Sequence, residues 1–208
     1  MCCATSVLEN RKGAKVMPPR AKFSREEIIK AGLDIVRENG LEALTARALG
    51  DKLGSSSRPI FTLFKNMEEL TGKILNAGRE IYDDYIRAGL SSELQFKGIG
   101  LQYIRFAKEE PILFRIMFMT PREKLITLCN GEGISEIDNN SEAVFECIQK
   151  GYGISRQKAG WLYENMWIYT HGIASMCATR VCRFSDEEIS TKLTEVFKSL
   201  LAEVKQTE

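Results

Sequence analysis

Side chains able to read DNA are concentrated in one short stretch, residues 57–65. They are Ser57, Arg58, Phe61, Thr62 and Lys65. A guanidinium can pair bidentately with guanine in the major groove, which contributes roughly 1–3 kcal/mol of base discrimination, and hydroxyls can bond to base edges. An ammonium group suits a phosphate oxygen as a point charge. These residue types therefore point to recognition of double-stranded DNA.

These side chains need an element that presents them together. Ile60 and Phe64 are four residues apart, so the spacing predicts a helix over 57–64 that packs inward on Leu49 and Leu53. Ser56 is the expected N-cap of this helix. A proline in the first turn is tolerated because the missing N–H has no partner there. The remaining side chains of the stretch then face outward.

Two helices are expected before this one. Ser24 and Glu27 form a capping box that opens the first helix, and Gly40 ends it. Thr45 caps a short second helix that ends at Gly54. Only a tight turn, residues 54–56, separates the second helix from the third. The three helices therefore describe a helix-turn-helix with a supporting helix.

Further groups around this unit could contact phosphates. Thr45, Ser56 and the free N–H groups of the helix starts suit phosphate oxygens, and Arg20 and Lys22 lie on an arm that could reach an adjacent groove. Residues 1–65 contain 12 Lys and Arg against 7 Asp and Glu, whereas the rest contains 17 against 21. This asymmetry favours a polyanionic partner for the basic head. The alternative is a small helical domain that happens to carry one polar helix with an arginine.

The sequence LTARALGDKLGSSSRPIFTLFKNMEEL, residues 44–70, resembles the DNA-binding domain of the TetR family of transcriptional regulators. The shared features are a Leu-Gly-x-Ser turn at 53–56, an aromatic at 61, a Phe-Lys pair at 64–65 and an acidic helix start at 68–69. The resemblance extends over 23–86 and is strongest over 44–70. The roles that the resemblance implies are base reading by Ser57, Arg58 and Thr62, and contacts to the DNA backbone or groove edge by Thr45, Arg47, Phe61 and Lys65.

Helical periodicity continues to the end of the chain. A long helix is expected from Asn66, and the period-2 alternation of strands is absent. Further helices are expected at about 93–108, 111–119, 139–150, 155–182 and 185–205, with 120–138 as the weakest stretch. The predicted fold class is therefore all-α, with about nine helices. The predicted organisation is a flexible basic tail over 1–21, a helix-turn-helix DNA-binding domain over 22–82 and a C-terminal domain over 83–208.

The C-terminal domain has a shorter resemblance of its own. The segments PILFRIMFM (111–119) and MWIYTHGIASM (166–176) are similar to a TetR subgroup marked by a tryptophan and a His-Gly pair. This resemblance implies a domain that binds a small-molecule effector and forms a homodimer. Residues 161–178 are apolar nearly all round, which predicts a central helix. With the last helix it could build a four-helix interface in a two-fold dimer, although the same pattern fits plain core. The candidate interface residues are Gly172, Ser175, Val196, Phe197 and Leu200.

Aromatic and methionine side chains concentrate in the same half of the chain. They can form either a well-filled core or a mainly apolar pocket in which a few polar groups orient an effector. His171 can either orient a ligand or be a hydrogen-bonded interior histidine. The candidate pocket residues are Tyr103, Phe106, Phe114, Met117, Phe118, Trp161, Asn165, Trp167 and His171.

Several classes of function are disfavoured by what the sequence lacks. It has no G-x-S-x-G and no P-loop, so we expect no enzyme and no cofactor. A single histidine rules out a site with several His ligands, and no pair of the six cysteines has C-x-x-C spacing, so no metal is expected. The N-terminus has no apolar run for a signal peptide, and we expect a cytoplasmic protein with no membrane partner.

The residues and the resemblance together predict a homodimeric, ligand-responsive regulator that binds a palindromic DNA operator. The resemblance favours a repressor that is released from the operator by a small apolar or amphipathic effector. Two alternatives stay open. One is a thiol- or redox-responsive regulator of the same fold that uses Cys147, Cys177 or Cys182. The other is a helical protein-interaction module with no role on DNA.

Overall fold

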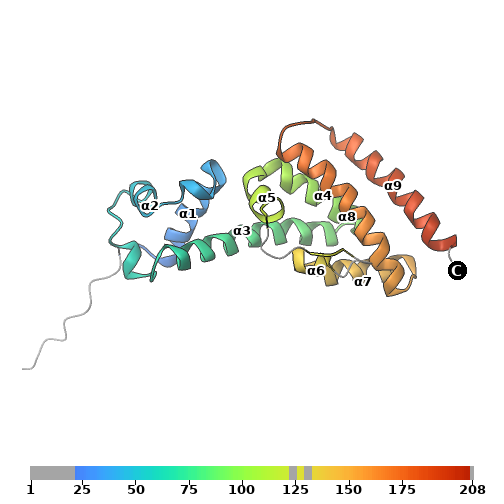
Figure 1. Cartoon of the computed structure of the whole chain (residues 1–208), viewed down its shortest axis with the longest axis horizontal. Helices are drawn as coiled ribbons and strands as arrows, with labels where there is room; N and C mark the ends of the chain where they lie inside the picture. The colour runs from blue at the N-terminus through green and yellow to red at the C-terminus, as the bar shows by residue number, and fades with distance from the viewer. Residues whose placement is uncertain (1–21, 122–125, 129–132, 207–208) are drawn as a thin grey trace, which may run out of the picture.

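A computed structural model describes residues 22–121, 126–128 and 133–206. In this part of the chain every regular element is a helix (Figure 1), which confirms the all-α prediction. The α-helices are α1 (Arg25–Asn39), α2 (Ala46–Lys52), α3 (Met67–Leu90), α4 (Gln95–Glu109), α5 (Pro111–Phe118), α6 (Ile134–Ile137), α7 (Ser141–Tyr152), α8 (Arg156–Ala178) and α9 (Asp186–Gln206). Two 3₁₀ helices, η1 (Leu41–Ala43) and η2 (Ile60–Thr62), lie among them. The predicted tail over 1–21 lies outside the described residues.

Helix boundaries differ from the predicted ones at two places in the C-terminal half. α8 ends at Ala178 rather than at 182, because Thr179 caps it and Arg180 adopts a left-handed φ of 58°. The predicted weak stretch over 120–138 contains only the short helix α6 among its described residues. In the N-terminal half, the helix predicted over 57–64 is replaced by turns and the short η2.

The first two helices begin where the caps predict. The hydroxyl of Ser24 accepts from the N–H of Glu27 at 3.1 Å, and the carboxylate of Glu27 accepts from the N–H of Ser24 at 2.7 Å. The hydroxyl of Thr45 accepts from the N–H of Ala48 at 3.1 Å. These bonds satisfy N–H groups that have no partner within the helix, so the local sequence fixes where α1 and α2 start.

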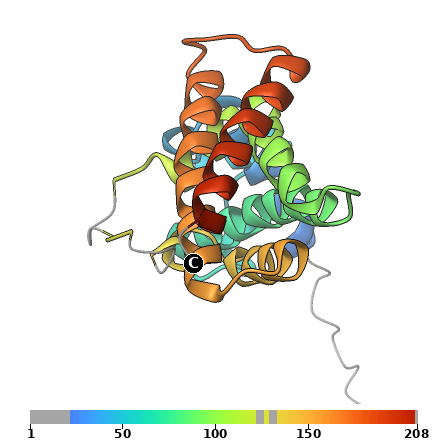
Figure 2. The same ribbon diagram turned by 90° about the vertical axis from the view of Figure 1, so that its right-hand side faces the viewer.

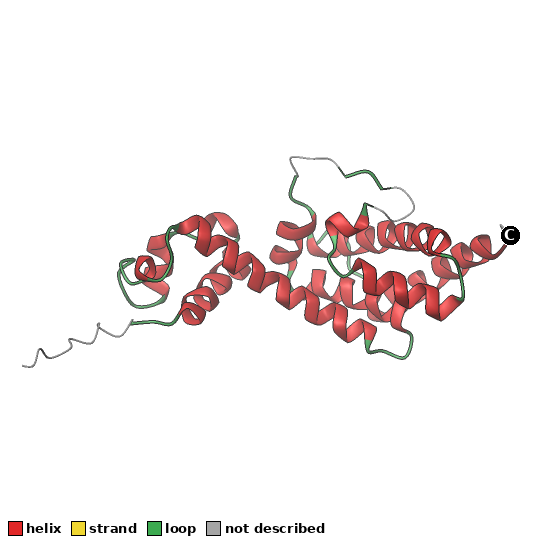
Figure 3. Ribbon diagram, turned by 90° about the horizontal axis from the view of Figure 1, so that it is seen from below, coloured by secondary structure: helices red, strands yellow, loops and turns green. Residues whose placement is uncertain are grey.

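Helix α3 runs through both halves of one continuous hydrophobic core. Its Met67 end lies with α1 and α2, and the rest of it runs along the C-terminal helices (Figures 1 and 3). Leu70 and Ile74 are fully buried near the first end, and Tyr82 and Ile86 are buried further along. One continuous helix therefore connects the N-terminal unit to the C-terminal bundle.

The C-terminal bundle is built around α4. This helix packs against α3, α5, α8 and α9, and α7 packs on α8. The core between these helices is aromatic: Phe106 and Phe114 are fully buried, and the Phe106 ring centroid lies 5.2 Å from that of Tyr82. α8 and α9 lie side by side at the end of the molecule away from α1 and α2 (Figures 1 and 2).

An ion pair ties α1 to the bundle. Glu110, between α4 and α5, has a side chain that is only 10% exposed. Its two carboxylate oxygens accept from Nε of Arg37, at 2.8 Å, and from Nη2 of the same guanidinium. This hydrogen-bonded carboxylate raises the pKa of Arg37 above its ordinary value. The bidentate geometry fixes the orientation of α1 against the corner between α4 and α5.

α3 and α4 cross with their backbones in contact. A Cβ added at Gly89 would lie 2.6 Å from Cα of Ile99 and 2.7 Å from its backbone nitrogen. A Cβ added at Gly98 on α4 would lie 2.7 Å from the carbonyl oxygen of Gly89. Backbone atoms cannot yield to such contacts as a flexible side chain can. The crossing therefore requires glycine on both helices.

The substitution Gly89→Ala is expected to destabilise the protein by about 1–3 kcal/mol, because the methyl group forces α3 and α4 apart. The measurement is the urea unfolding midpoint followed by circular dichroism. Gly72→Ala is the matched control on the same helix, because a Cβ there meets nothing within 4 Å. Helix propensity predicts a gain of up to about 1 kcal/mol for this control. Equal midpoints for the two variants would contradict the close crossing.

Candidate nucleic-acid interface and ligand pocket

The predicted helix over 57–64 is wrong: the structure has the single 3₁₀ turn η2 within a run of turns. The carbonyl of Ser57 accepts from the N–H of Ile60 at 3.1 Å, and that of Pro59 accepts from Thr62 at 3.3 Å. The Thr62 hydroxyl also donates to the Pro59 carbonyl, at 2.6 Å. Pro59 has no N–H to donate, and β-branched Ile60 and Thr62 favour an α-helix only weakly. The segment therefore closes as a tight turn.

The turn still buries the two apolar side chains that the spacing predicts to face inward. Ile60 is fully buried and Phe64 is 2% exposed, so both anchor the segment to the core. Ser57 is half-buried. The other candidate DNA-binding residues are all exposed: Lys22, Thr45, Arg47, Ser56, Arg58, Phe61, Thr62 and Lys65. We call residues 57–65 the polar turn.

The link between α2 and the polar turn is tight. A Cβ added at Gly50 would lie 2.9 Å from the carbonyl oxygen of Ser55, and the N–H of Ser55 donates to the carbonyl of Gly50 at 2.9 Å. Gly54 has φ of +63°, which glycine adopts at little cost. The chain therefore doubles back on α2, and the exposed groups of α2 and of the polar turn share one region of the surface.

Arg25 holds the far end of the polar turn, a role that the sequence did not reveal. Its guanidinium donates to the carbonyl of Leu63 and to the carboxylate of Glu69, the latter at 2.6 Å, and lies 4.2 Å from the ring centroid of Phe64. Glu69 also accepts from the N–H of Lys65 at 2.7 Å. This backbone bond and then Arg25 lower the pKa of Glu69. Arg25 follows directly on a cap, so the sequence signal it gives is only that of a helix start.

Two cations of the polar turn have no acidic partner. Arg58 and Lys65 make no ion pair with any described residue. Two other candidate cations do have partners. Nε of Arg47 lies 4.0 Å from Oδ2 of Asp51, and Nζ of Lys22 donates to the hydroxyl of Ser55 at 3.1 Å. The surface therefore offers a guanidinium and an ammonium that are free to meet phosphates or base edges.

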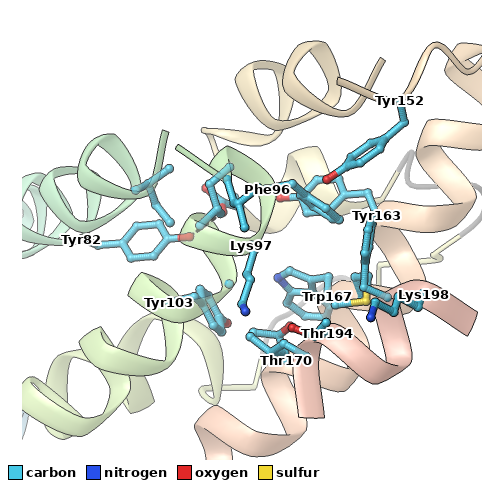
Figure 4. A pocket seen from close by; sticks show the side chains of 18 residues that line it. Tyr82, Phe96, Lys97, Tyr103, Tyr152, Tyr163, Trp167, Thr170, Thr194 and Lys198 are labelled. Carbon is cyan, nitrogen blue, oxygen red and sulfur yellow. Dashed lines mark hydrogen bonds between the residues drawn. The ribbon is translucent and has the colours of Figure 1, made fainter. Parts of the chain in front are cut away.

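A cavity of about 300 Å³ lies within the C-terminal bundle (Figure 4). Tyr103 and Trp167, two of the candidate pocket residues, line it. Phe197, a candidate for the dimer interface, also lines it. The principal lining side chains come from α3 (Tyr82, Ile86), α4 (Phe96, Lys97, Tyr103), α8 (Tyr163, Trp167, Thr170) and α9 (Thr194, Phe197, Lys198).

The other candidate pocket residues do not line this cavity. Phe106 and Phe114 are fully buried in the aromatic core, and Met117 and Phe118 are half-buried against it. Trp161 and Asn165 lie on α8, where the side-chain amide of Asn165 donates to the carbonyl of Trp161 at 2.8 Å. The aromatic residues of this half are thus divided between the core and the lining of a cavity.

His171 lies behind the cavity wall and supports two of its members. Its Nδ1 lies 2.9 Å from the hydroxyl of Tyr103, and its ring stacks on Trp167 with centroids 4.8 Å apart. Burial lowers the pKa of His171 below its ordinary value. Of the two predicted roles, the geometry fits the hydrogen-bonded interior histidine.

A buried carboxylate at the cavity was missed by the sequence analysis. Asp138 is 2% exposed and accepts from the hydroxyl of Tyr82 at 2.5 Å. Its other oxygen accepts from the N–H and the side-chain amide of Asn140, at 2.9 and 3.1 Å. Burial and then the charge of Asp138 raise the pKa of Tyr82 well above its ordinary value, so this phenol stays a donor. Asp138 lies in the weak stretch 120–138, where no periodicity marked it.

The candidate dimer residues on α8 lie on its outer side. Gly172 is exposed, and a Cβ added there meets nothing within 4 Å. Ile168, one turn earlier, is 51% exposed, and Ser175 is half-buried. The remaining candidates, Val196 and Leu200 on α9, are half-buried against the core. An apolar strip on α8 is therefore left open.

Two of the described thiols, those of Cys147 and Cys177, are poorly suited to a redox role. Burial raises the pKa of Cys147 and of Cys177, which lowers the fraction present as reactive thiolate. Both, like Cys182, are half-buried free cysteines.

No known family model matches the chain, and no curated protein matches it. Among the described residues no cluster of three or more His, Cys, Asp or Glu side chains could hold a metal ion. No helix in this part of the chain has the length and apolar character needed to cross a membrane. The basis for a functional proposal is therefore the geometry of the polar turn and of the cavity.

The lowered pKa of His171 predicts a pH dependence of stability. The unfolded chain binds a proton near pH 6.5 whereas the folded chain resists it, so stability is lost as the pH falls from 6.5 through the folded pKa. His171→Gln removes this loss, and the chain has no second histidine. Unfolding midpoints in urea at pH 7.5 and 5.5 should therefore fall more for the natural chain than for the variant. An identical fall would show that His171 titrates normally in the folded protein.

Proposed function

We propose that this protein is a ligand-responsive, DNA-binding transcriptional regulator of the TetR type, and that it acts as a homodimeric repressor. The observation that carries the proposal is the polar turn. Its apolar residues Ile60 and Phe64 are buried, while Arg58 and Lys65 are exposed and form no ion pair with any described residue. A short rigid segment that presents an unpaired guanidinium beside hydroxyl groups suits the major groove.

The surroundings of the polar turn support DNA as the partner. Exposed Thr45 and Arg47 at the start of α2 lie on the helix that the tight turn folds back upon. Such groups suit the phosphates that flank a groove. The TetR resemblance of residues 44–70 assigns the same positions to DNA contacts.

The cavity supports a role for a small-molecule effector. Its wall includes Tyr82 and Ile86 of α3, the helix whose other end packs with the polar turn's supporting core. A ligand that moves this wall would tilt α3 and change the separation of the two polar turns from the ~34–36 Å of consecutive half-sites. A coupling free energy of about 1–3 kcal/mol would weaken operator binding 5- to 150-fold.

A homodimer follows from the same proposal, because a single polar turn reads only one half-site. The exposed strip of α8 around Ile168 and Gly172 belongs to the C-terminal bundle and not to the unit that carries the polar turn. A two-fold axis through the bundle would leave both polar turns free for DNA.

The DNA role is tested by selecting bound sequences from a random duplex pool and then measuring salt-dependent affinity for the enriched site. We expect a palindrome bound by a dimer. Arg58→Ala should lose roughly 1–3 kcal/mol of discrimination at one base position of each half-site. Lys65→Ala should weaken binding to all sequences and reduce the salt slope by about one.

Lys205→Ala is the matched control, because this exposed lysine lies near the end of α9, far from the polar turn. It should leave both affinity and salt slope unchanged. Binding that enriches no sequence, or that Arg58→Ala and Lys205→Ala affect equally, would refute the assignment.

The dimer is tested by Gly172→Arg, which places a charged side chain on the open strip of α8. Sedimentation at micromolar concentration should show a dimer for the natural chain and a monomer for the variant, because a buried unpaired charge strongly disfavours association. Gly151→Arg on α7 is the control, since a Cβ there also meets nothing within 4 Å. A dimer that survives Gly172→Arg would place the interface elsewhere.

A further inference from the structure

Trp167 presents a hydrogen-bond donor to the cavity without an acceptor. Its Nε1–H is buried and has no hydrogen-bond partner among the described residues. The indole ring stacks on His171 with an interplanar angle of 10°, and His171 is held in turn by the hydroxyl of Tyr103. A buried donor without an acceptor is unfavourable, and these contacts keep it in place. The cavity therefore has a fixed position that suits an acceptor atom.

The ammonium group of Lys97 faces the same space. Figure 4 shows this side chain extending from α4 into the space that Tyr103 and Trp167 also line. Lys97 forms no ion pair with any described residue, and neither does Lys198, which lines the cavity from α9. A cation and an N–H donor thus line one cavity, and this combination favours an anion.

Asp138 is the carboxylate among the described residues that line the cavity, and both of its oxygens already accept hydrogen bonds. Asp138 accepts from Tyr82 through one oxygen and from both nitrogen donors of Asn140 through the other. These donors are neutral groups, so the charge balance of the lining is that of one carboxylate against the two ammonium groups of Lys97 and Lys198. The charges of the described lining residues therefore favour an anionic ligand over a cationic one.

The rest of the wall suits an apolar body. Phe96, Tyr163, Phe197 and Leu193 contribute rings and methyl groups. The volume of about 300 Å³ would hold about ten groups of the size of a water molecule, at about 30 Å³ each. A ligand with one charged head and an apolar remainder would match both parts of the wall.

We propose that this cavity binds an amphipathic anion, a carboxylate with an apolar body of about ten heavy atoms, whose head group is bound by Lys97 and by Nε1–H of Trp167. The proposal rests on the function proposed above, and it names the chemical class of the effector. The carboxylate would accept a charge-assisted hydrogen bond from the ammonium and a second bond from the indole.

Isothermal titration calorimetry of the full chain with three ten-carbon probes tests the sign of the charge. The probes are decanoate, decan-1-ol and decyltrimethylammonium, each below its micelle-forming concentration. We expect decanoate to bind at least tenfold more tightly than the alcohol, and the quaternary ammonium to bind more weakly than both. Equal affinities for decanoate and the alcohol, tighter binding of the ammonium, or no binding of any probe would overturn the proposal.

Variants then test the two donors. Lys97→Met should weaken decanoate binding at least tenfold and leave decan-1-ol unchanged, and Lys97→Arg should restore most of the decanoate affinity. Trp167→Phe, which keeps a ring but removes the N–H, should also weaken decanoate selectively. Lys158→Met, on α8 outside the cavity, is the matched control and should change neither. Equal losses for decanoate and the alcohol would mean that Lys97 only supports the fold.

The outcome of the decanoate titration does not depend on whether the protein binds DNA, so the two proposals can be refuted separately. Decanoate binding without an enriched DNA sequence would retain the anion site and refute the regulator. An enriched operator without decanoate binding would retain the regulator and refute the anion site. Weaker operator binding in the presence of decanoate, lost in Lys97→Met, would support both.

Discussion

The burial of one continuous helix in both halves of the molecule is the constraint on which the rest of the structure depends. α3 packs Leu70 and Ile74 among the N-terminal helices and Tyr82 and Ile86 in the aromatic bundle. A shift of α3 at one end must therefore be accommodated by packed side chains along its length, because side chains in protein interiors have few alternative arrangements. The ion pair between Arg37 and Glu110 adds a second connection between the same two units.

The two candidate sites are built in the same way: packed side chains hold the segment in place, and a few polar groups remain available to a ligand. In the polar turn, Ile60 and Phe64 are buried, and Arg58 is exposed and forms no ion pair with any described residue. In the cavity, His171 stacks on Trp167 and Asp138 accepts from Tyr82, and the Nε1–H of Trp167 has no acceptor among the described residues. In each case packed neighbours position a segment that carries a polar group available to a ligand.

Caps and helical periodicity, which depend on neighbouring residues, predicted much of the fold but little of the cavity. Ser24 and Thr45 correctly placed the starts of α1 and α2, because a cap acts within three residues. The helix expected over 57–64 failed because Pro59 and the β-branched residues beside it favour a turn. The cavity brings together α3, α4, α8 and α9, and Tyr82, which donates to Asp138, lies 56 residues away in the chain. Such contacts leave no periodic trace in a sequence.

The crossing of α3 and α4 gives the long helix the properties of a lever. Backbone contact at Gly89 makes this point a fulcrum near one end of α3. At 1.5 Å per residue, Tyr82 lies about 10 Å from the fulcrum and Met67 about 33 Å. A displacement of about 1 Å at the cavity wall would therefore move the Met67 end by about 3 Å. The long arm of α3 thus enlarges a displacement, so the binding of a small ligand at the cavity would produce a larger movement at the Met67 end of the helix.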